Sequence, residues 1–315
     1  MKQPLPQAIK SFAKINLYLQ ILNKRRDNFH NLSTLFCRLD LADSIIFKNR
    51  LDNLIKIKCK NKDVPKDETN LCWRAAQLLR HEKKLNFGLD IEIKKNIPVG
   101  SGLGGGSSNA ASVLLGLNKY WKLNLSLKRL ATLGAKLGSD VAFFIYNTKF
   151  ALGSQRGDKI KPLAFLNKRK LWFILIYPNI KISTPLVYQK FDSYLSASEL
   201  TRPFWQSKNR DFTKRAGLTR PGCNVKMLTS ELLEKGSKLD RKYLRNDLEI
   251  ATLSLYPVVN QVKKAFSDMG LDKIMMSGSG AAVFAFCNNR KQAQGLSSKL
   301  KKLYKAWQVF VVASI

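Results

Sequence analysis

Residues 98–112 read Pro-Val-Gly-Ser-Gly-Leu-Gly-Gly-Gly-Ser-Ser-Asn-Ala-Ala-Ser, so that five glycines run directly into a segment of small residues with helical character. Glycine allows the backbone to turn sharply and to come close to a ligand. A helix that begins at Ser107 or Ser108 would point its first N–H groups into the loop, where an anion is favoured. The stretch therefore predicts a phosphate-binding loop. The alternative is a flexible linker, but a linker is not normally followed at once by an amphipathic helix.

Two familiar phosphate motifs do not explain this loop. It lacks the Gly-Lys-Ser/Thr ending of the nucleoside triphosphatase loop. Gly100, Gly102 and Gly105 match the G-x-G-x-x-G spacing of a dinucleotide-binding turn, which also needs an acidic residue about 20 residues later. That residue is missing, because after Glu92 the next carboxylate is Asp140. A different kind of phosphate loop is required.

The composition describes a folded protein. The 315 residues are 45% hydrophobic and 10% aromatic, enough for two modest domains or one large one. The longest apolar run, 171–177, is far too short to span a membrane, and polar residues interrupt the N-terminus where a signal peptide would be apolar. Five widely spaced cysteines without a C-x-x-C motif favour reduced thiols in a cytoplasmic protein. We expect no membrane partner.

The net charge of +33 favours anionic partners, either a polyphosphate substrate or nucleic acid. Because the lysines are scattered along the chain, a generally basic surface without specific meaning accounts for most of this charge. Residues 93–139 and 273–315 contain no acidic residue, and each stretch holds a serine- and glycine-containing loop. The absence of nearby carboxylates suits a phosphate site.

Hydrophobic periodicity predicts strands and helices in both halves of the chain, which indicates an α+β fold with two lobes that meet near residue 150. The expected strands are 13–22, 32–39, 44–48, 54–58, 89–97, 151–153, 171–177, 273–276, 282–286 and 307–313. The expected helices are 70–80, 108–120, 126–137, 226–236, 256–269 and 291–303.

Five motifs occur in a familiar order: Phe12-Ala-Lys-Ile-Asn-Leu, the glycine-rich loop, Leu137-Gly-Ser-Asp-Val, Asn246-Asp-Leu-Glu and Ser277-Gly-Ser-Gly. Over nearly its whole length the chain resembles the GHMP kinases, the relatives of galactokinase, homoserine kinase, mevalonate kinase and phosphomevalonate kinase. The resemblance implies a two-lobed fold with the active site in the cleft between the lobes. It implies an ATP-binding lobe at 1–153 and a substrate lobe at 154–315.

Two local motifs narrow the resemblance. Arg26-Asp-Asn-Phe-His and Ile182-Ser-Thr-Pro are similar to motifs of those GHMP kinases that phosphorylate a cytidine diphosphate ester in the non-mevalonate isoprenoid pathway. The implied partners are ATP, Mg²⁺ and this small-molecule substrate. The sequence does not identify the side chains that hold the metal. Another GHMP kinase, of homoserine or mevalonate type, is the alternative within the family.

Phosphoryl transfer to an alcohol depends mainly on positioning and charge stabilisation, and it needs a group that accepts the alcohol proton. Asp140, the first acidic residue after the loop, suits that role, and the resemblance places Lys14 beside it as the second catalytic residue. From local sequence alone, Asp140 could instead be a helix N-cap and Lys14 a surface lysine.

The resemblance assigns the remaining site residues. Those expected to bind ATP are Pro98, Gly100, Ser101, Gly102, Leu103, Gly104, Gly105, Gly106, Ser107 and Ser108 of the loop, with Asn70 and Lys95 flanking adenine. Those expected to bind substrate are Asn16, Phe29, His30, Thr184, Pro185, Tyr188, Ser277 and Gly278.

Among these substrate residues, His30 would contact the cytosine edge, and Phe29 and Tyr188 would stack on the base. The family usually has tyrosine at the position of Phe29, so a hydroxyl contact is absent there. A turn residue at His30 and a purely structural turn at Ser277 are the alternatives.

Segment 202–226 has no counterpart in the family pattern. It interleaves basic and aromatic residues, as single-stranded nucleic-acid sites do, although a solvated surface insertion is the favoured interpretation. The alternative from another functional class is therefore a basic nucleic-acid-binding protein on a kinase-like scaffold. A scaffold without activity should have lost Lys14 or Asp140, and both are present. We do not expect specific nucleic-acid binding.

Overall fold

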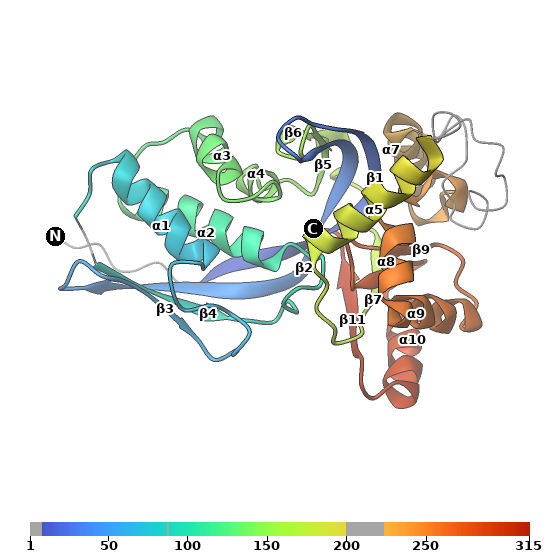
Figure 1. The fold of residues 1–315 in the computed structure, drawn as a ribbon. Coiled ribbons are helices and arrows are strands. Elements are labelled where there is room, and N and C mark those ends of the chain that lie inside the picture. Colours follow the sequence, from blue (N-terminus) through green and yellow to red (C-terminus); the bar gives the residue numbers. More distant parts are fainter. Residues whose placement is uncertain (1–7, 87, 200–223) are drawn as a thin grey trace.

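The computed structural model describes residues 8–86, 88–199 and 224–315, with side chains omitted for 196–199. Two β-sheets and the helices packed on them form this part of the chain (Figure 1). The predicted α+β class is confirmed. The basic and aromatic residues 202–223 of the segment singled out above lie outside the described residues. The division of the chain after residue 153 stays a prediction.

The first sheet has seven strands in the order β3-β4-β2-β1-β8, and β5 pairs with both β2 and β6. Its strands are β1 (Ile9–Lys24), β2 (His30–Arg50), β3 (Ile55–Cys59), β4 (Gly88–Lys94), β5 (Phe150–Ser154), β6 (Lys159–Pro162) and β8 (Arg245–Asn246). β1 and β2 form a long antiparallel hairpin, and β8, which comes from the second half of the chain, pairs in parallel with β1.

The two strands expected at 32–39 and 44–48 are one continuous strand, β2. The expected break between them is wrong, and other segments satisfy the carboxylates of the acidic residues that lie there. Asp40 accepts a hydrogen bond from the Ala313 amide at 2.9 Å. The buried Asp43 accepts from the amides of Asn96 and Ile97 at 2.7 and 2.8 Å. A polar residue inside a strand is tolerated when it is hydrogen-bonded in this way.

Helices α1 (Leu71–Glu82), α2 (Gly105–Tyr120), α3 (Leu127–Ala135) and α4 (Val141–Ile145) pack beside the first sheet. Their apolar faces share one core with strand residues such as Phe47 and Ile91. Helix α2 begins at Gly105, earlier than the predicted start at Ser107 or Ser108, because Gly104 takes a left-handed conformation (φ 70°) and ends the loop there. The helix N-terminus is consequently formed by glycines.

The second sheet has four antiparallel strands in the order β11-β7-β10-β9. They are β7 (Trp172–Tyr177), β9 (Ile274–Met276), β10 (Val283–Cys287) and β11 (Gln308–Ala313). The accompanying helices are α5 (Thr184–Glu199), α7 (Val225–Lys235), α8 (Glu249–Leu255), α9 (Pro257–Asp268) and α10 (Arg290–Leu303), with short 3₁₀ turns at Ala164–Leu166, Gly236–Lys238 and Arg241–Tyr243. Periodicity did not predict α5, although its first residues were singled out as a motif.

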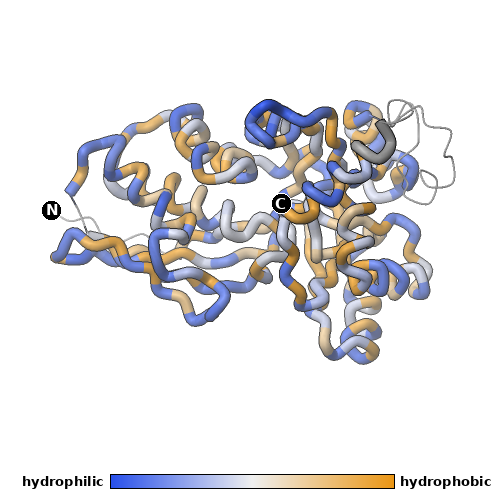
Figure 2. Tube along the Cα trace, in the orientation of Figure 1, coloured by the Kyte–Doolittle hydropathy of each residue, from blue (hydrophilic) through white to orange (hydrophobic). Residues whose placement is uncertain are grey.

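A shared hydrophobic core joins the two sheets. Leu17 and Leu35 of the first sheet belong to the same buried cluster as Phe173 and Phe284 of the second. The two phenylalanine rings meet edge to face, with centroids 5.6 Å apart. Figure 2 shows hydrophobic stretches along many of the strands and hydrophilic stretches at many of the outer loops. No helix among the described residues is long and apolar enough to cross a bilayer.

Candidate active site

The glycine-rich loop is held by a second glycine turn. Gly102 has φ +78°, and a Cβ atom built there would lie 2.2 Å from the Ser277 carbonyl oxygen, so a side chain would disrupt the contact. The Ser277 hydroxyl donates to the Gly102 carbonyl at 3.1 Å, and the Ala282 amide donates to the Ser101 carbonyl at 3.0 Å. The turn after β9 therefore sets the position of the loop that precedes α2.

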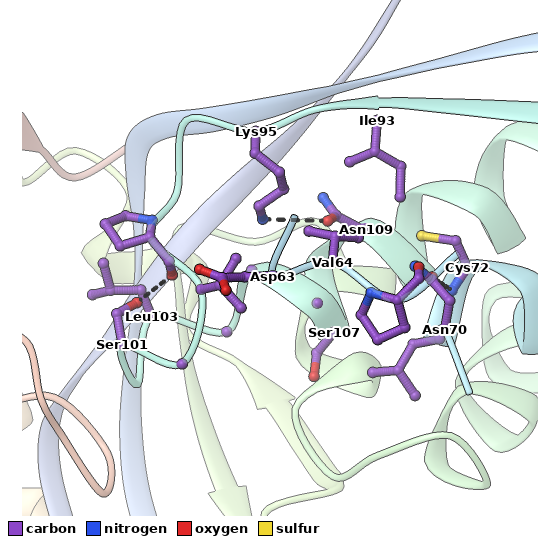
Figure 3. Close-up of a pocket in the computed structure, with 18 of the residues that line it drawn as sticks. Asp63, Val64, Asn70, Cys72, Ile93, Lys95, Ser101, Leu103, Ser107 and Asn109 are labelled. Carbon is purple, nitrogen blue, oxygen red and sulfur yellow. Dashed lines mark hydrogen bonds between the residues drawn. The ribbon is translucent and has the colours of Figure 1, made fainter. Parts of the chain in front are cut away.

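A cavity of about 360 Å³ lies along this loop (Figure 3). The predicted ATP-binding residues all line it except Ser108, which is buried and accepts a hydrogen bond from the Ser11 hydroxyl at 2.8 Å. Asn70 lines the cavity and caps α1, since its side-chain oxygen accepts from the Cys72 amide at 2.8 Å. Figure 3 shows Ser101 and Leu103 of the loop together at the left, and Asn70 and Cys72 at the right.

Lys95 lies beside the same cavity and forms a buried ion pair with Asp43. Asn109 donates to the same carboxylate at 2.9 Å. A paired and largely buried ammonium group supplies positive potential near the cavity and has little freedom to move. Lys95 thus connects the wall of the cavity to β2 and α2.

Lys14 and Asp140 come from distant parts of the chain and meet at the loop. The Lys14 Nζ atom lies 3.0 Å from Asp140 Oδ2, with the lysine side chain 5% exposed and the aspartate side chain 30% exposed. The same ammonium donates to Asn16 Oδ1 at 2.8 Å, and the Lys14 amide donates to the Leu103 carbonyl at 2.9 Å. Strand β1 therefore carries the lysine directly against the loop.

Asp140 stands at the N-terminal end of α4, where local sequence allowed a capping role. Asp140 is the N-cap residue of α4, but its side chain makes no capping hydrogen bond. The alternative of a surface lysine at Lys14 is wrong, because the side chain is buried. The carboxylate is ion-paired to Lys14 and remains partly accessible to solvent.

A second cavity, of about 760 Å³, adjoins the first, and Gly102, Gly104 and Ser107 line both. Lys14 and Asp140 line the second cavity near these shared residues. The predicted substrate residues also line it, with the exception of Ser277, which is fully buried. A ligand in the large cavity can thus reach the loop and the Lys14–Asp140 pair together.

The large cavity also contains a cluster of aromatic and polar side chains. The rings of His30 and Tyr188 are stacked, with centroids 5.1 Å apart and an interplanar angle of 28°. Burial is the main cause that raises the pKa of the Tyr188 hydroxyl, and the charge of Asp140 adds to it. Phe29 is 51% exposed, and the Arg156 guanidinium lies 5.1 Å from its ring centroid. The apolar surface of these rings is suited to a planar ligand.

Comparisons with known proteins agree, and the relatives match nearly the whole chain. Family models described as the GHMP kinases N terminal domain and the GHMP kinases C terminal domain match residues 70–148 and 229–306. A protein of Geobacillus sp. named 4-diphosphocytidyl-2-C-methyl-D-erythritol kinase is 37% identical, over 96% of this chain and 95% of that protein. A protein of the same name from Thermodesulfovibrio yellowstonii is 34% identical, over 97% of each.

This chain belongs to the GHMP kinase family. Among solved structures it is similar to a 4-(cytidine 5'-diphospho)-2C-methyl-D-erythritol kinase, with a TM-score of 0.73, 26% identity and 98% of each chain covered. A homoserine kinase from Cytophaga hutchinsonii, at 20% identity and a TM-score of 0.68, covers 99% of this chain and 96% of that one and has the same fold. GHMP kinases use ATP, and the cavity along the loop is the candidate nucleotide site.

Several residues in the cavities of this GHMP kinase were not predicted. Thr34, Arg156 and Asp192 line the large cavity. Thr34 accepts a hydrogen bond from Asn16 at 2.8 Å, and Asp192 contacts His30. A helix prediction over α5 would have found Asp192, because residues four apart share a helix face and Tyr188 was already assigned. No pattern in the sequence signals Arg156 or Thr34.

Proposed function

We propose that this GHMP kinase transfers the γ-phosphoryl group of ATP to the 2-hydroxyl of 4-diphosphocytidyl-2-C-methyl-D-erythritol, a step of the non-mevalonate isoprenoid pathway. The observation that carries the proposal is the large cavity, which connects the Lys14–Asp140 pair at the phosphate loop to the aromatic cluster around His30. The names of the relatives that match nearly the full length of the chain support the same substrate.

The ATP phosphates fit the loop. Gly102 and Gly104 leave no room for side chains, so the backbone itself forms the cradle. The amides at the start of α2 point toward an anion, and the helix dipole favours negative charge there. Asn70 and Lys95, which line the same cavity, would flank the adenine.

The predicted lobe boundary near residue 153 and the cytoplasmic location remain proposals.

Mg²⁺ is proposed as the metal that accompanies ATP. Magnesium is usually held by one or two carboxylates, water and substrate phosphates. Among the described residues no cluster of three or more potential metal-ligating side chains occurs, so most of the coordination would come from phosphate and water. Asp140 and the hydroxyl of Ser107 are among the oxygen-bearing side chains that line the large cavity beside the loop and would be available to the metal. When bound, the metal would neutralise developing charge on the phosphate oxygens.

The proton of the substrate hydroxyl passes to Asp140. As the bond from the substrate 2-oxygen to the γ-phosphorus forms, the bond from that phosphorus to the β–γ bridging oxygen breaks, and the hydroxyl proton goes to the carboxylate. Lys14, 3.0 Å from the carboxylate, forms an ion pair with it and can donate to the substrate oxygen. Asn16 and Thr34 hold the ammonium group in place through successive hydrogen bonds of 2.8 Å.

The cytosine occupies the part of the cavity near His30. Phe29 and Tyr188 supply ring surface, and base stacking on an aromatic side chain is worth about 1–3 kcal/mol. Thr184 begins α5 and its hydroxyl lies 2.8 Å from the Ser279 hydroxyl, so it joins the helix to the second glycine turn. Gly278 lines the cavity beside this contact and is close to the reacting groups, since a Cβ atom there would lie 3.5 Å from Lys14 Nζ.

An ADP-release assay over a panel of alcohols tests the proposal. The cytidine diphosphate ester should be phosphorylated, whereas its uridine analogue and free methylerythritol phosphate should be poor substrates, because a site that pairs with a polar edge rejects ligands that leave it unpaired. Efficient turnover of homoserine or mevalonate would refute this substrate and leave the kinase assignment intact. ³¹P NMR of the product should confirm that the new phosphate is attached to the 2-oxygen of the substrate.

A further inference from the structure

We propose that Asp192, a residue of α5 in the second half of the chain, fixes the tautomer of His30 and thereby makes the site select cytosine over uracil. This inference rests on the proposed function, because it concerns how the same cavity would recognise its base. Asp192 would act through His30 and is therefore a positioning residue, not a catalytic one.

The contact between His30 and Asp192 is short, and both side chains are at least partly buried. His30 Nε2 lies 2.7 Å from Asp192 Oδ1, with the histidine side chain 4% exposed and the aspartate side chain 24% exposed. Tyr188, one helical turn before Asp192, stacks on the His30 ring. The ring is therefore held on its face by one residue of α5 and at its Nε2 atom by another.

Lys24 contacts the oxygen of the Asp192 carboxylate that His30 does not contact. Lys24 Nζ donates to Asp192 Oδ2 at 2.7 Å. Lys24 also pairs with His30 across the β1–β2 hairpin, so the three residues form one local cluster. A carboxylate accepts hydrogen bonds and cannot donate them when ionised. An imidazole that is neutral and donates to this carboxylate has its proton on Nε2, which leaves Nδ1 as an acceptor.

The acceptor at Nδ1 has consequences for the base. Within the described part of the chain, no hydrogen bond is made to His30 Nδ1, and the residue lines the large cavity. Cytosine carries an exocyclic amino donor where uracil carries a carbonyl acceptor. An Nδ1 acceptor can accept a hydrogen bond from the cytosine amino group. Opposite uracil, Nδ1 would face a carbonyl oxygen, and neither of these two atoms carries a proton to donate. Leaving polar groups unpaired in a buried site strongly disfavours the wrong ligand.

Asp192→Asn should move the proton of the neutral His30 imidazole from Nε2 to Nδ1. The Lys24 ammonium requires an acceptor, so the amide oxygen turns toward Lys24 and the amide NH₂ group faces His30. Nε2 then has to accept, which moves the proton to Nδ1. The double variant Asp192→Asn with Lys24→Met removes the Lys24 donor, so that the amide oxygen can again accept from Nε2–H. Lys24→Met alone, which leaves the Asp192–His30 contact in place, is the matched control.

Two measurements on the full chain test this inference. The first is ¹⁵N NMR of the imidazole rings, which is simple because the chain has only two histidines, and a His81→Asn variant assigns the second. The second is calorimetric binding of cytidine diphosphate and uridine diphosphate. Thermal unfolding and ATP binding establish that each variant is folded.

We expect a protonated Nε2 in the wild type and in Lys24→Met, a protonated Nδ1 in Asp192→Asn, and a return toward Nε2 in the double variant. In Asp192→Asn the ratio of the binding constants for cytidine and uridine diphosphate should fall by about tenfold or more. The cytosine amino group loses its hydrogen bond to Nδ1, and the repulsive contact between Nδ1 and the uracil carbonyl is removed. The ratio should be partly restored in the double variant.

An unchanged tautomer and an unchanged preference in folded Asp192→Asn would overturn the inference and leave the proposed function standing. A wild type that binds the cytidine and uridine diphosphates equally would also refute the inference, whereas the proposed function is refuted only if the cytidine diphosphate ester is not phosphorylated. A protonated Nδ1 in the wild type would refute the inference by itself, whatever the base preference.

Discussion

Asp140→Asn tests the proposed proton acceptor directly. The amide preserves the shape of the side chain but cannot take a proton. General-base catalysis contributes about 10²- to 10⁴-fold to a rate, which corresponds to about 2.7–5.4 kcal/mol of activation free energy at about 1.36 kcal/mol for each factor of ten. We expect kcat to fall by that factor while the KM for ATP changes little, because the loop amides are untouched.

The fold should survive this substitution. Lys14 loses its carboxylate partner at 3.0 Å but keeps the hydrogen bond to Asn16 at 2.8 Å. Hydrogen bonds to charged groups contribute about 1.5–3 kcal/mol to stability, and the value here is smaller because the Asp140 side chain is 30% exposed and solvent screens the pair. We therefore expect the free energy of unfolding to fall by about 1–2 kcal/mol.

The assay is coupled ADP release with the cytidine diphosphate ester, supplemented by single-turnover measurements that separate chemistry from product release. Asp27→Asn is the control, since it removes a second carboxylate that lines the same cavity but lies in the β1–β2 turn. That variant should leave kcat near the wild-type value. If Asp140→Asn kept more than about a tenth of wild-type kcat, the assignment of the base would be refuted.

Three further predictions concern the loop, the lysine and the charge. Lys14→Met should lower kcat nearly as far as Asp140→Asn, and the double variant should lose little more, because both groups act on one proton; additive losses in steady-state kinetics would contradict this. Gly102→Ala should lower Tm and raise the KM for ATP, since its Cβ would lie 2.2 Å from a backbone oxygen of the facing turn. Gly106→Ala, whose Cβ would lie 3.7 Å from Leu71 Cδ1 in ordinary contact, should leave Tm unchanged. RNA binding should be weak and disappear between low and physiological salt; nanomolar binding at physiological salt that is lost on deleting residues 202–220 would favour the nucleic-acid function instead.

Much of the fold was predictable because it is encoded in local pattern. The strands of the second sheet and helices α1, α3 and α10 were expected close to their observed bounds. The start of α2 was misplaced because no local rule shows where a run of glycines stops being loop, and the left-handed Gly104 decides it. Helix α5 was missed because Pro185 near its start and its mixed polarity hide the periodicity, and its packing against α8 supplies what the pattern lacks.

The sequence by itself determined that a glycine-rich loop precedes a helix and that the chain has the α+β class, and its ordered motifs predicted which residues to expect at the site. These are properties of short segments, in which residue type and spacing limit the backbone conformation. Only the tertiary structure decided that Lys14 and Asp140 lie 3.0 Å apart, that Ser277 supports the loop, and that Asp192 meets His30. Such contacts join residues more than a hundred positions apart, and their geometry depends on how the sheets and helices pack around a shared core.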